Sequence, residues 1–568
     1  MNRKNLTAAV LAGLAGVAGI AGTAQAVNIN PDGLGQVLLY PYYTTNGGNV
    51  TLLSVVNTTD EAKAVKVRFL EGENSVEVLD FNLYMSAYDV WTASIEPQPV
   101  DNMDESCDPD PGDGITVLCD GPVLVVNADE NTCMVPKFGK VQSFLPFAYR
   151  AFGDFEGDGG TQDDARMNEG HFEMIEMGVL DPEPTTDYKG DAFDPADWAT
   201  HQGTPWLPGD CDALNAAWAI AADGTELVPG AWKFDKGLNI LPPTGGLFGG
   251  AGVVNVLKGA LHTYEADAIN GWNLSGFIGQ GGIESLHTEP GSLVPNLNSG
   301  DILESVVFSD RGQLITDTLA RSVDAVSYLF MHDSLMNEYT TETALLARTE
   351  WVLTFPTKRF YVEQVPVLAP FTTPWAVVGE EDYATACETV ALTGLWDREE
   401  RDEGEPGCED TNSCETDRPP IVSPPPPIII PPAPPGVEPF QLCYETNVIR
   451  FGGDVMIGDI DTGELPMESE ILGTPRGKYL NFDNTDVFKD QNFQYGWARV
   501  ELDDYLIAVD GDAVVASRDP LGQLNGLPVA GFGVSAFSNA FLTDLQGNRV
   551  LSAYGALYSH KATRKQGS

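Results

Sequence analysis

The stretch KAVKVRF, Lys63 to Phe69, decides the fold class because its side chains alternate between apolar and basic. Val65, Val67 and Phe69 fall on one face of an extended chain, and the two basic residues between them fall on the other. Alternation with a period of two is typical of a half-buried β-strand. We therefore predict a strand whose apolar face lies in a core and whose basic face meets solvent.

The same pattern returns in VLDFNLY, Val78 to Tyr84, where Leu79, Phe81 and Leu83 alternate with polar residues. The turn-forming stretches NTTDEA and EGENS separate the apolar runs at the spacing of a β-sandwich. We predict an immunoglobulin-like antiparallel β-sandwich over residues 27–97.

Alternation also marks the last part of the chain. In GWARVELDD, the side chains of Ala498, Val500 and Leu502 share one face. We predict a second β-sandwich over residues 440–568. The residues between the two ends, 98–418, form a mixed, β-rich middle region, so the predicted fold class is mainly β with sandwiches at both ends.

Two segments of the middle region are predicted to be helical. GDCDALNAAWAIAADG, residues 209–224, has apolar residues at helical spacing, with Asp212 as the expected N-cap. AVSYLFMHDSLMNEY, Ala325 to Tyr339, is a second candidate helix and precedes the strand WVLTFP.

The stretch PPIVSPPPPIIIPPAPPGVEP, residues 419–439, is the most unusual in composition. Its prolines can neither pair in a sheet nor continue a helix, so we expect polyproline II structure. Three interpretations are open: a spacer between domains, a ligand for a proline-binding module, or a loop closed at its base by a disulfide between Cys414 and Cys443. We favour the proline-rich spacer, because Cys408 and Cys414 are close enough in sequence to bridge locally.

The first 26 residues predict export. MNRKN is a short basic start, the following run is apolar and small, and TAQA is a cleavage pattern, which together are typical of a secretory signal peptide over 1–26. All eight cysteines come later, and an even count in an exported protein indicates disulfides. We predict no transmembrane segment in the mature chain, and a location at the cell surface, outside the cell or in the periplasm.

The charge balance restricts the partners. The chain has 83 acidic and 31 basic side chains, with a net charge of −52. Such a chain repels nucleic acid and anionic membranes. The acidity suits a solvated surface in high salt, recruitment of divalent cations, or attraction to cationic partners.

One segment has the spacing of a calcium loop. In DFEGDGG, Asp154, Glu156 and Asp158 stand at alternate positions before glycine. The twelfth position is an alanine, so the segment is not an EF-hand, but Asp163 or Asp164 would complete an irregular site. We predict calcium as a candidate ligand here, with a solvated turn as the alternative.

Other chemistry is sparse. His171 and Glu173 share a face of a strand, but a surface pair or a satisfied pair in the core is the more common arrangement. The sequence contains no G-x-S-x-G, no P-loop and no G-x-G-x-x-G. We therefore name no catalytic and no cofactor-binding residue.

Three segments resemble uncharacterised exported proteins of Gram-negative bacteria: GQVLLYPYYTTNGGNVTLLSVVNTT, LDFNLYMSAYDVWTA and WVLTFPTKRF. The resemblance covers about a third of the chain and implies a location in the envelope. It implies no activity.

Two classes of function fit these observations. The first is an acidic cell-surface or envelope protein with a structural or interaction role, self-associating or binding other envelope components, with calcium-dependent assembly as one form. The alternative is a secreted glycan-binding protein or a carboxylate-based hydrolase. We favour the first, because no catalytic constellation stands out.

Overall fold

The computed structural model describes most of the chain after the predicted signal peptide, of which it includes only Ala26. The described residues are 26–98, 121–127, 129–137, 139–151, 156–222, 227–378, 383–397, 439–452, 467–482, 494–503, 505–509, 512–516, 518–538, 546–547 and 553–566. The protein is mainly β, with 46% strand and 10% helix, which confirms the predicted class. Among the described residues, no helix is both long and apolar enough to cross a membrane.

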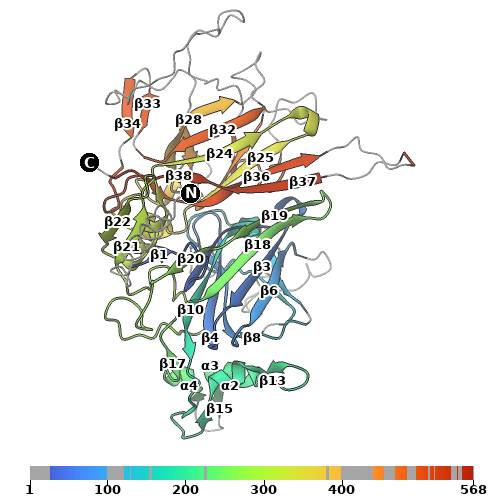
Figure 1. Ribbon diagram of the computed structural model, residues 1–568, viewed down its shortest axis with the longest axis vertical. Helices are drawn as coiled ribbons and strands as arrows, with labels where there is room; N and C mark the ends of the chain where they lie inside the picture. Colours follow the sequence, from blue (N-terminus) through green and yellow to red (C-terminus); the bar gives the residue numbers. More distant parts are fainter. Residues whose placement is uncertain are drawn as a thin grey trace, which may run out of the picture.

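Two antiparallel sheets form the lower half of the molecule in Figure 1. The eight-stranded sheet runs β1 (Asn28–Ile29), β20 (Asp267–Asn270), β2 (Val37–Thr44), β10 (Glu169–Leu180), β4 (Lys63–Glu71), β5 (Glu77–Met85) and β8 (Cys133–Val135), with β17 (Ile240–Leu241) paired to β10. The six-stranded sheet runs β19 (Ala260–Glu265), β18 (Leu247–Asn255), β3 (Val50–Asn57), β6 (Val90–Glu96), β7 (Val123–Val126) and β9 (Val141–Ser143). The strands of the predicted 27–97 module thus pair with strands that come much later in the chain.

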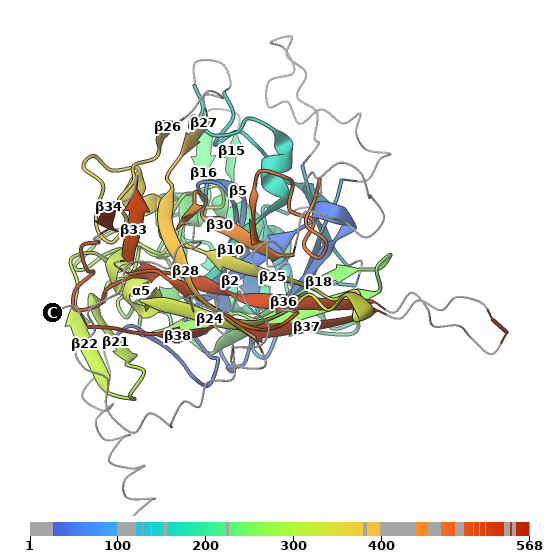
Figure 2. The same ribbon diagram turned by 90° about the horizontal axis from the view of Figure 1, so that it is seen from above.

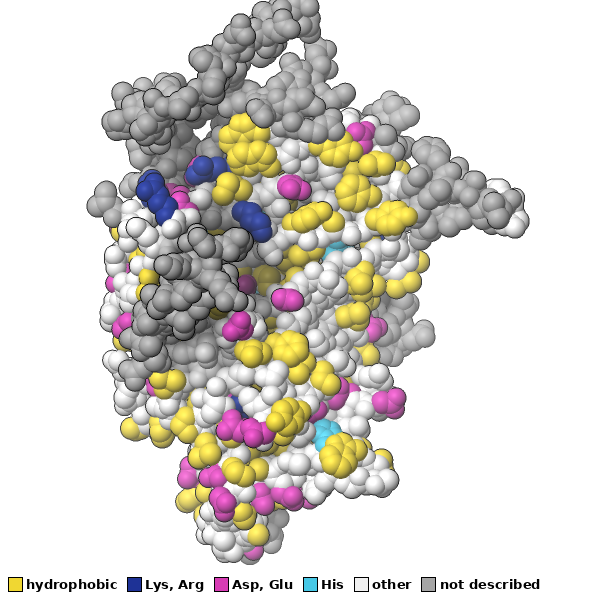
Figure 3. All heavy atoms as spheres, in the orientation of Figure 1, with side chains coloured by type: hydrophobic (Ala, Val, Ile, Leu, Met, Phe, Trp, Pro, Cys, Tyr) yellow, Lys and Arg dark blue, Asp and Glu magenta, His cyan; other side chains and the backbone are white. Residues whose placement is uncertain are grey.

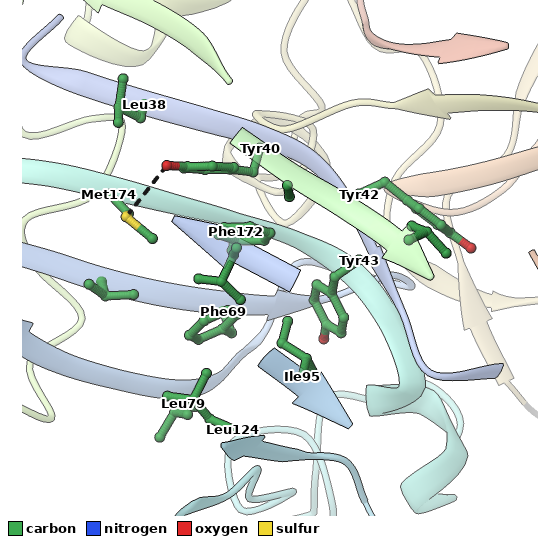
Figure 4. Close-up of a cluster of buried hydrophobic side chains, with 14 of the residues drawn as sticks. Leu38, Tyr40, Tyr42, Tyr43, Phe69, Leu79, Ile95, Leu124, Phe172 and Met174 are labelled. Atoms are coloured by element: carbon green, nitrogen blue, oxygen red, sulfur yellow. Dashed lines mark hydrogen bonds between the residues drawn. The ribbon is translucent and has the colours of Figure 1, made fainter. Parts of the chain in front are cut away.

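A hydrophobic core fills the space between these sheets (Figure 4). The ring of Tyr40 stacks on that of Phe172 with centroids 4.2 Å apart, and its hydroxyl donates to the carbonyl of Ser54 on the opposite sheet. This close approach requires a glycine on β18, because a Cβ at Gly249 would lie 2.0 Å from the Tyr40 hydroxyl. The layout is that of a sandwich, and its assignment as immunoglobulin-like stays a prediction.

Two five-stranded sheets form the upper half. One runs β29 (Pro439–Leu442), β28 (Glu388–Asp397), β32 (Tyr495–Glu501), β24 (Ser334–Thr340) and β38 (Lys561–Thr563). The other runs β31 (Tyr479–Phe482), β30 (Thr446–Phe451), β25 (Arg348–Thr354), β36 (Ala530–Ser538) and β37 (Ala553–Ser559). Three strands of this half, β24, β25 and β28, precede residue 440.

The two halves share a continuous core. Seen from above, β25 and β36 lie over β2, and contacts join these strands (Figure 2). The ring of Phe532 on β36 stacks on Tyr264 of β19 with centroids 4.9 Å apart and meets Tyr42 of β2 edge to face. Burial of this aromatic cluster binds the upper sheets to the lower ones.

A small helical insert lies at the lower end of the molecule (Figure 1). It contains α2 (Pro195–Ala199), α3 (Cys211–Trp218) and α4 (Ala231–Phe234), and the disulfide between Cys133 and Cys211 ties α3 to β8. The predicted helix is present as α3, but its N-cap is Asp210, whose side chain accepts from the N–H of Ala213. The expected cap, Asp212, lies inside the first turn instead.

The connection between Asp397 and Pro439, which contains the proline-rich segment, joins two neighbouring strands of one sheet. β28 and β29 are antiparallel, with Ala391 opposite Pro439, and a disulfide joins Cys387 to Cys443 directly beside this ladder. The predicted spacer, 419–439, lies outside the described residues except for Pro439. Cys443 is thus bonded to Cys387 and not to Cys414, and the two ends of this connection are held together at one sheet edge.

Candidate functional site

Two of the carboxylates predicted to bind calcium, Asp158 and Asp164, are paired with arginines. Asp154 lies outside the described residues, and Glu156 is exposed. Asp158 accepts bonds from Nη1 and Nη2 of Arg166 at 2.9 and 2.5 Å, and from the N–H of Gly160 at 2.9 Å. Its carboxylate therefore already has a cationic partner.

The two remaining candidates stand at the start of a short 3₁₀ helix, Asp164–Asn168. Asp163 caps this helix by accepting from the N–H of Ala165 at 2.9 Å, and Asp164 forms an ion pair with Arg150 at 2.6 Å. Within the described ranges, no group of three or more His, Cys, Asp or Glu side chains is arranged to hold a metal ion. Calcium binding at this segment stays a prediction.

Arg166 is the centre of a buried polar network that the sequence does not reveal. Its side chain is fully buried, and its Nε and Nη2 donate to the two carboxylate oxygens of Glu71 at 2.8 and 2.9 Å. Burial alone would raise the pKa of Glu71, but the guanidinium and backbone N–H groups of the β4–β5 turn lower it below its usual value. The network joins this turn to the segment around Asp158, which is a structural role.

His171 and Glu173 lie on β10 and are both buried. Glu173 pairs with Arg68, and burial lowers the pKa of His171 to about 3, so the imidazole is neutral. Both side chains belong to the interior, and the Nδ1 atom of His171 has no hydrogen-bond partner among the described residues.

The prediction that β4 has a solvent-exposed basic face is wrong, because all nine residues of the strand are buried. Arg68 pairs with Glu77 at 2.5 Å, and Lys66 pairs with Asp80 and donates to the carbonyl of Glu289 at 3.1 Å. The loop around Glu289 covers this face, and paired charges make its burial possible.

The outer face of the six-stranded sheet has the opposite character, because it is exposed and, apart from Glu96 and Glu265 at the ends of β6 and β19, its described residues are uncharged. One cross-strand row on this face consists of Thr263, Gly252, Leu52, Ser94 and Val125, taken from five neighbouring strands. Leu52 is 47% exposed. We call the outward-facing residues of β19, β18, β3, β6 and β7 the sheet face.

A hollow of about 610 Å³ lies on the sheet face. Fourteen described residues line it, and none of them is charged. Gly250 and Gly252 on β18 make room for the hollow because they have no side chain. A Cβ at Gly252 would lie 3.1 and 3.2 Å from side-chain atoms of Thr263 and Leu261. In Figure 3 the area over β18 and β3 is mostly white and yellow, with few acidic side chains.

The sheet face meets the upper half of the molecule at β37. The Nδ1 atom of His262 on β19 lies 3.2 Å from the carbonyl oxygen of Ala556 on β37. Tyr554 and Tyr558 on β37 are exposed, so aromatic side chains lie on the neighbouring strand of the upper half. Burial lowers the pKa of His262, which keeps this imidazole neutral.

Comparison of the chain with protein-family models, with curated proteins and with solved structures finds no match. The function must therefore be argued from the geometry.

The sheet face was not identified from the sequence, although a signal for it exists. The stretches VTLLSVVN and LFGGAGVVN, which form β3 and β18, contain no charged residue in a chain with 83 acidic side chains. Such uncharged strands are typical of sheets covered on both faces. Only the structure shows that one of the two faces is uncovered.

Proposed function

We propose that the protein is an exported structural component that self-associates through the sheet face, so that the partner is a second copy of the chain. The observation that carries the proposal is an exposed, uncharged hollow on a chain with a net charge of −52. Contiguous exposed apolar surface is a mark of an interaction site.

The distribution of charge, and not its sum, favours a second copy as the occupant of this hollow. Two molecules that each carry −52 repel one another, and the repulsion is least at a contact centred on the hollow, whose described lining has no acidic side chain. A twofold arrangement would place the sheet face of one copy against the sheet face of the other. A cationic partner, in contrast, would be attracted to the acidic remainder of the surface.

Disulfides support the exported location. Cys133–Cys211 and Cys387–Cys443 are bonded, and such bonds persist in oxidising compartments such as the periplasm or the cell exterior. The predicted signal peptide agrees with that location.

Sedimentation velocity over a range of concentrations tests the proposal. We expect the mass of the purified protein to rise with concentration, and Leu52→Glu to keep it monomeric because the new carboxylates would face each other across the interface. Ile283→Glu is the matched control, since Ile283 is 95% exposed and lies outside the sheet face. A wild-type protein that stays monomeric throughout, or two variants that behave alike, would refute the proposal.

A further inference from the structure

A second hollow, of about 600 Å³, lies where the lower and upper halves of the molecule meet. The lower half contributes the turn after β1 and the strands β19 and β20, and the upper half contributes β24, β36, β37 and β38. His332 and Phe330 complete the wall at the end of α5 (Ser322–Phe330). We call this space the junction hollow.

Asp267 on β20 is an unpaired carboxylate in the junction hollow. Among the described residues, none forms a hydrogen bond or an ion pair with its side chain. Burial raises the pKa of Asp267 to about 7, with no neighbouring charge to offset it. An acid that is desolvated without a partner destabilises a fold, so its presence in a hollow indicates a ligand.

The two histidines of the junction hollow differ in their bonding. His560 is satisfied, because its Nε2–H donates to the carbonyl of Val352 at 3.0 Å and its Nδ1 accepts from Asn337 at 3.0 Å. The Nδ1 atom of His332, in contrast, is buried with no hydrogen-bond partner among the described residues. Burial first, and the nearby Arg564 second, hold the pKa of His332 well below its usual value, so this imidazole is neutral.

The lining disfavours an anionic ligand. The described lining residues include no lysine or arginine, while Glu265 stands exposed at the rim, so an anion would meet only carboxylates. Apolar side chains, among them Leu335, Ala530 and Leu557, lie between the polar groups. This combination offers hydrogen-bond acceptors beside apolar surface, as a sugar ring with hydroxyl groups and C–H faces requires.

We propose that the junction hollow binds a neutral sugar, with the Asp267 carboxylate accepting a hydrogen bond from a ligand hydroxyl and the apolar side chains of the wall packing against the C–H face of the ring. Sugar binding does not require self-association, although Thr263 and Tyr264 line both hollows. Asp267 shares a strand face with Ile269, which packs against α5, and it is not part of the sheet face.

Saturation-transfer NMR with hexoses of matched shape tests this proposal on the whole protein. We expect at least one of glucose, galactose and mannose to receive saturation, and glucuronate, which adds a negative charge, to receive none. Glucosamine is the cationic member of the series. Saturation of glucosamine alone would overturn the proposal, since the site would then recognise an amine, and a lack of transfer to every hexose would overturn it as well.

Variants locate the site. Asp267→Asn should reduce the saturation transfer at least tenfold, and Ser559→Trp should abolish it, because Ser559 is an exposed lining residue and the indole would fill the hollow. Asp310→Asn, at an exposed acid outside the hollow, is the matched control and should bind as the wild type does. Binding that survives in both hollow variants would place the sugar elsewhere and refute the assignment.

Discussion

The contribution of a charged residue to the stability of this protein depends on whether it is buried and whether it is paired. Arg166, Glu71 and Asp158 form a buried network in which each charge has a partner. Lys137 and Asp212 form an ion pair 2.7 Å apart, but the side chains are 65% and 78% exposed. The physical rule is that a buried pair becomes costly when one partner is removed, whereas an exposed pair contributes little.

Arg166→Gln should therefore destabilise the protein by about 3–5 kcal/mol, because it leaves Glu71 buried without its counter-charge. The matched control Lys137→Gln should change the free energy of unfolding by less than about 1 kcal/mol. Urea unfolding followed by tryptophan fluorescence measures both. Equal effects of the two substitutions would contradict the burial of Arg166.

Asp267 is the counter-example, since its carboxylate is desolvated without a partner. Its pKa is about 7 in the folded protein and would be near 3.9 in the unfolded chain. The folded state thus binds this proton more tightly, so Asp267 lowers stability progressively from about pH 4 to pH 7, and the full cost is present above pH 7.

Asp267→Asn should accordingly stabilise the protein by about 2–4 kcal/mol at pH 8 and have little effect near pH 4. Thermal unfolding at the two pH values checks this expectation. A substitution that stabilises the fold while removing sugar binding would identify Asp267 as a residue retained for function. A stabilisation of equal size at both pH values would show that the carboxylate is not desolvated.

The positions of strands could be predicted from the sequence, but the segments that cover their faces could not. The alternation of Val65, Val67 and Phe69 locates β4 correctly, because a strand with one apolar face has this pattern wherever it pairs. What covers the opposite face depends on the loop around Glu289, more than 200 residues later, and no local pattern contains that information.

Helix ends show the same limit. Of the candidate helix Ala325 to Tyr339, only the part up to Phe330 is helical, and β24 follows from Ser334. Pairing of β24 with β32 and β38 overrides the local preference. The candidate calcium segment is a similar case, since the sequence shows the spacing of its acids but not the arginines that hold Asp158 and Asp164.

The disulfide Cys387–Cys443 links β28 and β29, the two strands on either side of the connection that contains the proline-rich segment. It joins residues 56 positions apart, beside the β28–β29 ladder. In the loop-entropy description, removing a bridge over such a distance costs about 4 kcal/mol. The double variant Cys387→Ser with Cys443→Ser should lose stability of this order in urea unfolding, and an unchanged midpoint would show that the ladder holds the connection without the bridge.

At the scale of the whole molecule, the net charge opposes association while the sheet face favours it. The two effects respond differently to salt, because screening weakens the repulsion between acidic surfaces and leaves apolar contact intact. An assembly driven by attraction between opposite charges would weaken as salt is added. The sign of the salt dependence therefore distinguishes the sheet face from the acidic surface as the site of contact.

We expect the association constant from sedimentation velocity to rise as sodium chloride is increased from about 0.05 to 0.5 M, a range over which the Debye length falls from about 14 to 4 Å. Leu52→Glu should remain monomeric at both ends of this range, and Ile283→Glu should follow the wild type. Calcium chloride at equal ionic strength tests the predicted calcium dependence separately, because a larger rise in mass than sodium chloride produces requires a bound ion and not only screening. Association that falls with salt would move the contact to the acidic surface and refute self-association through the sheet face.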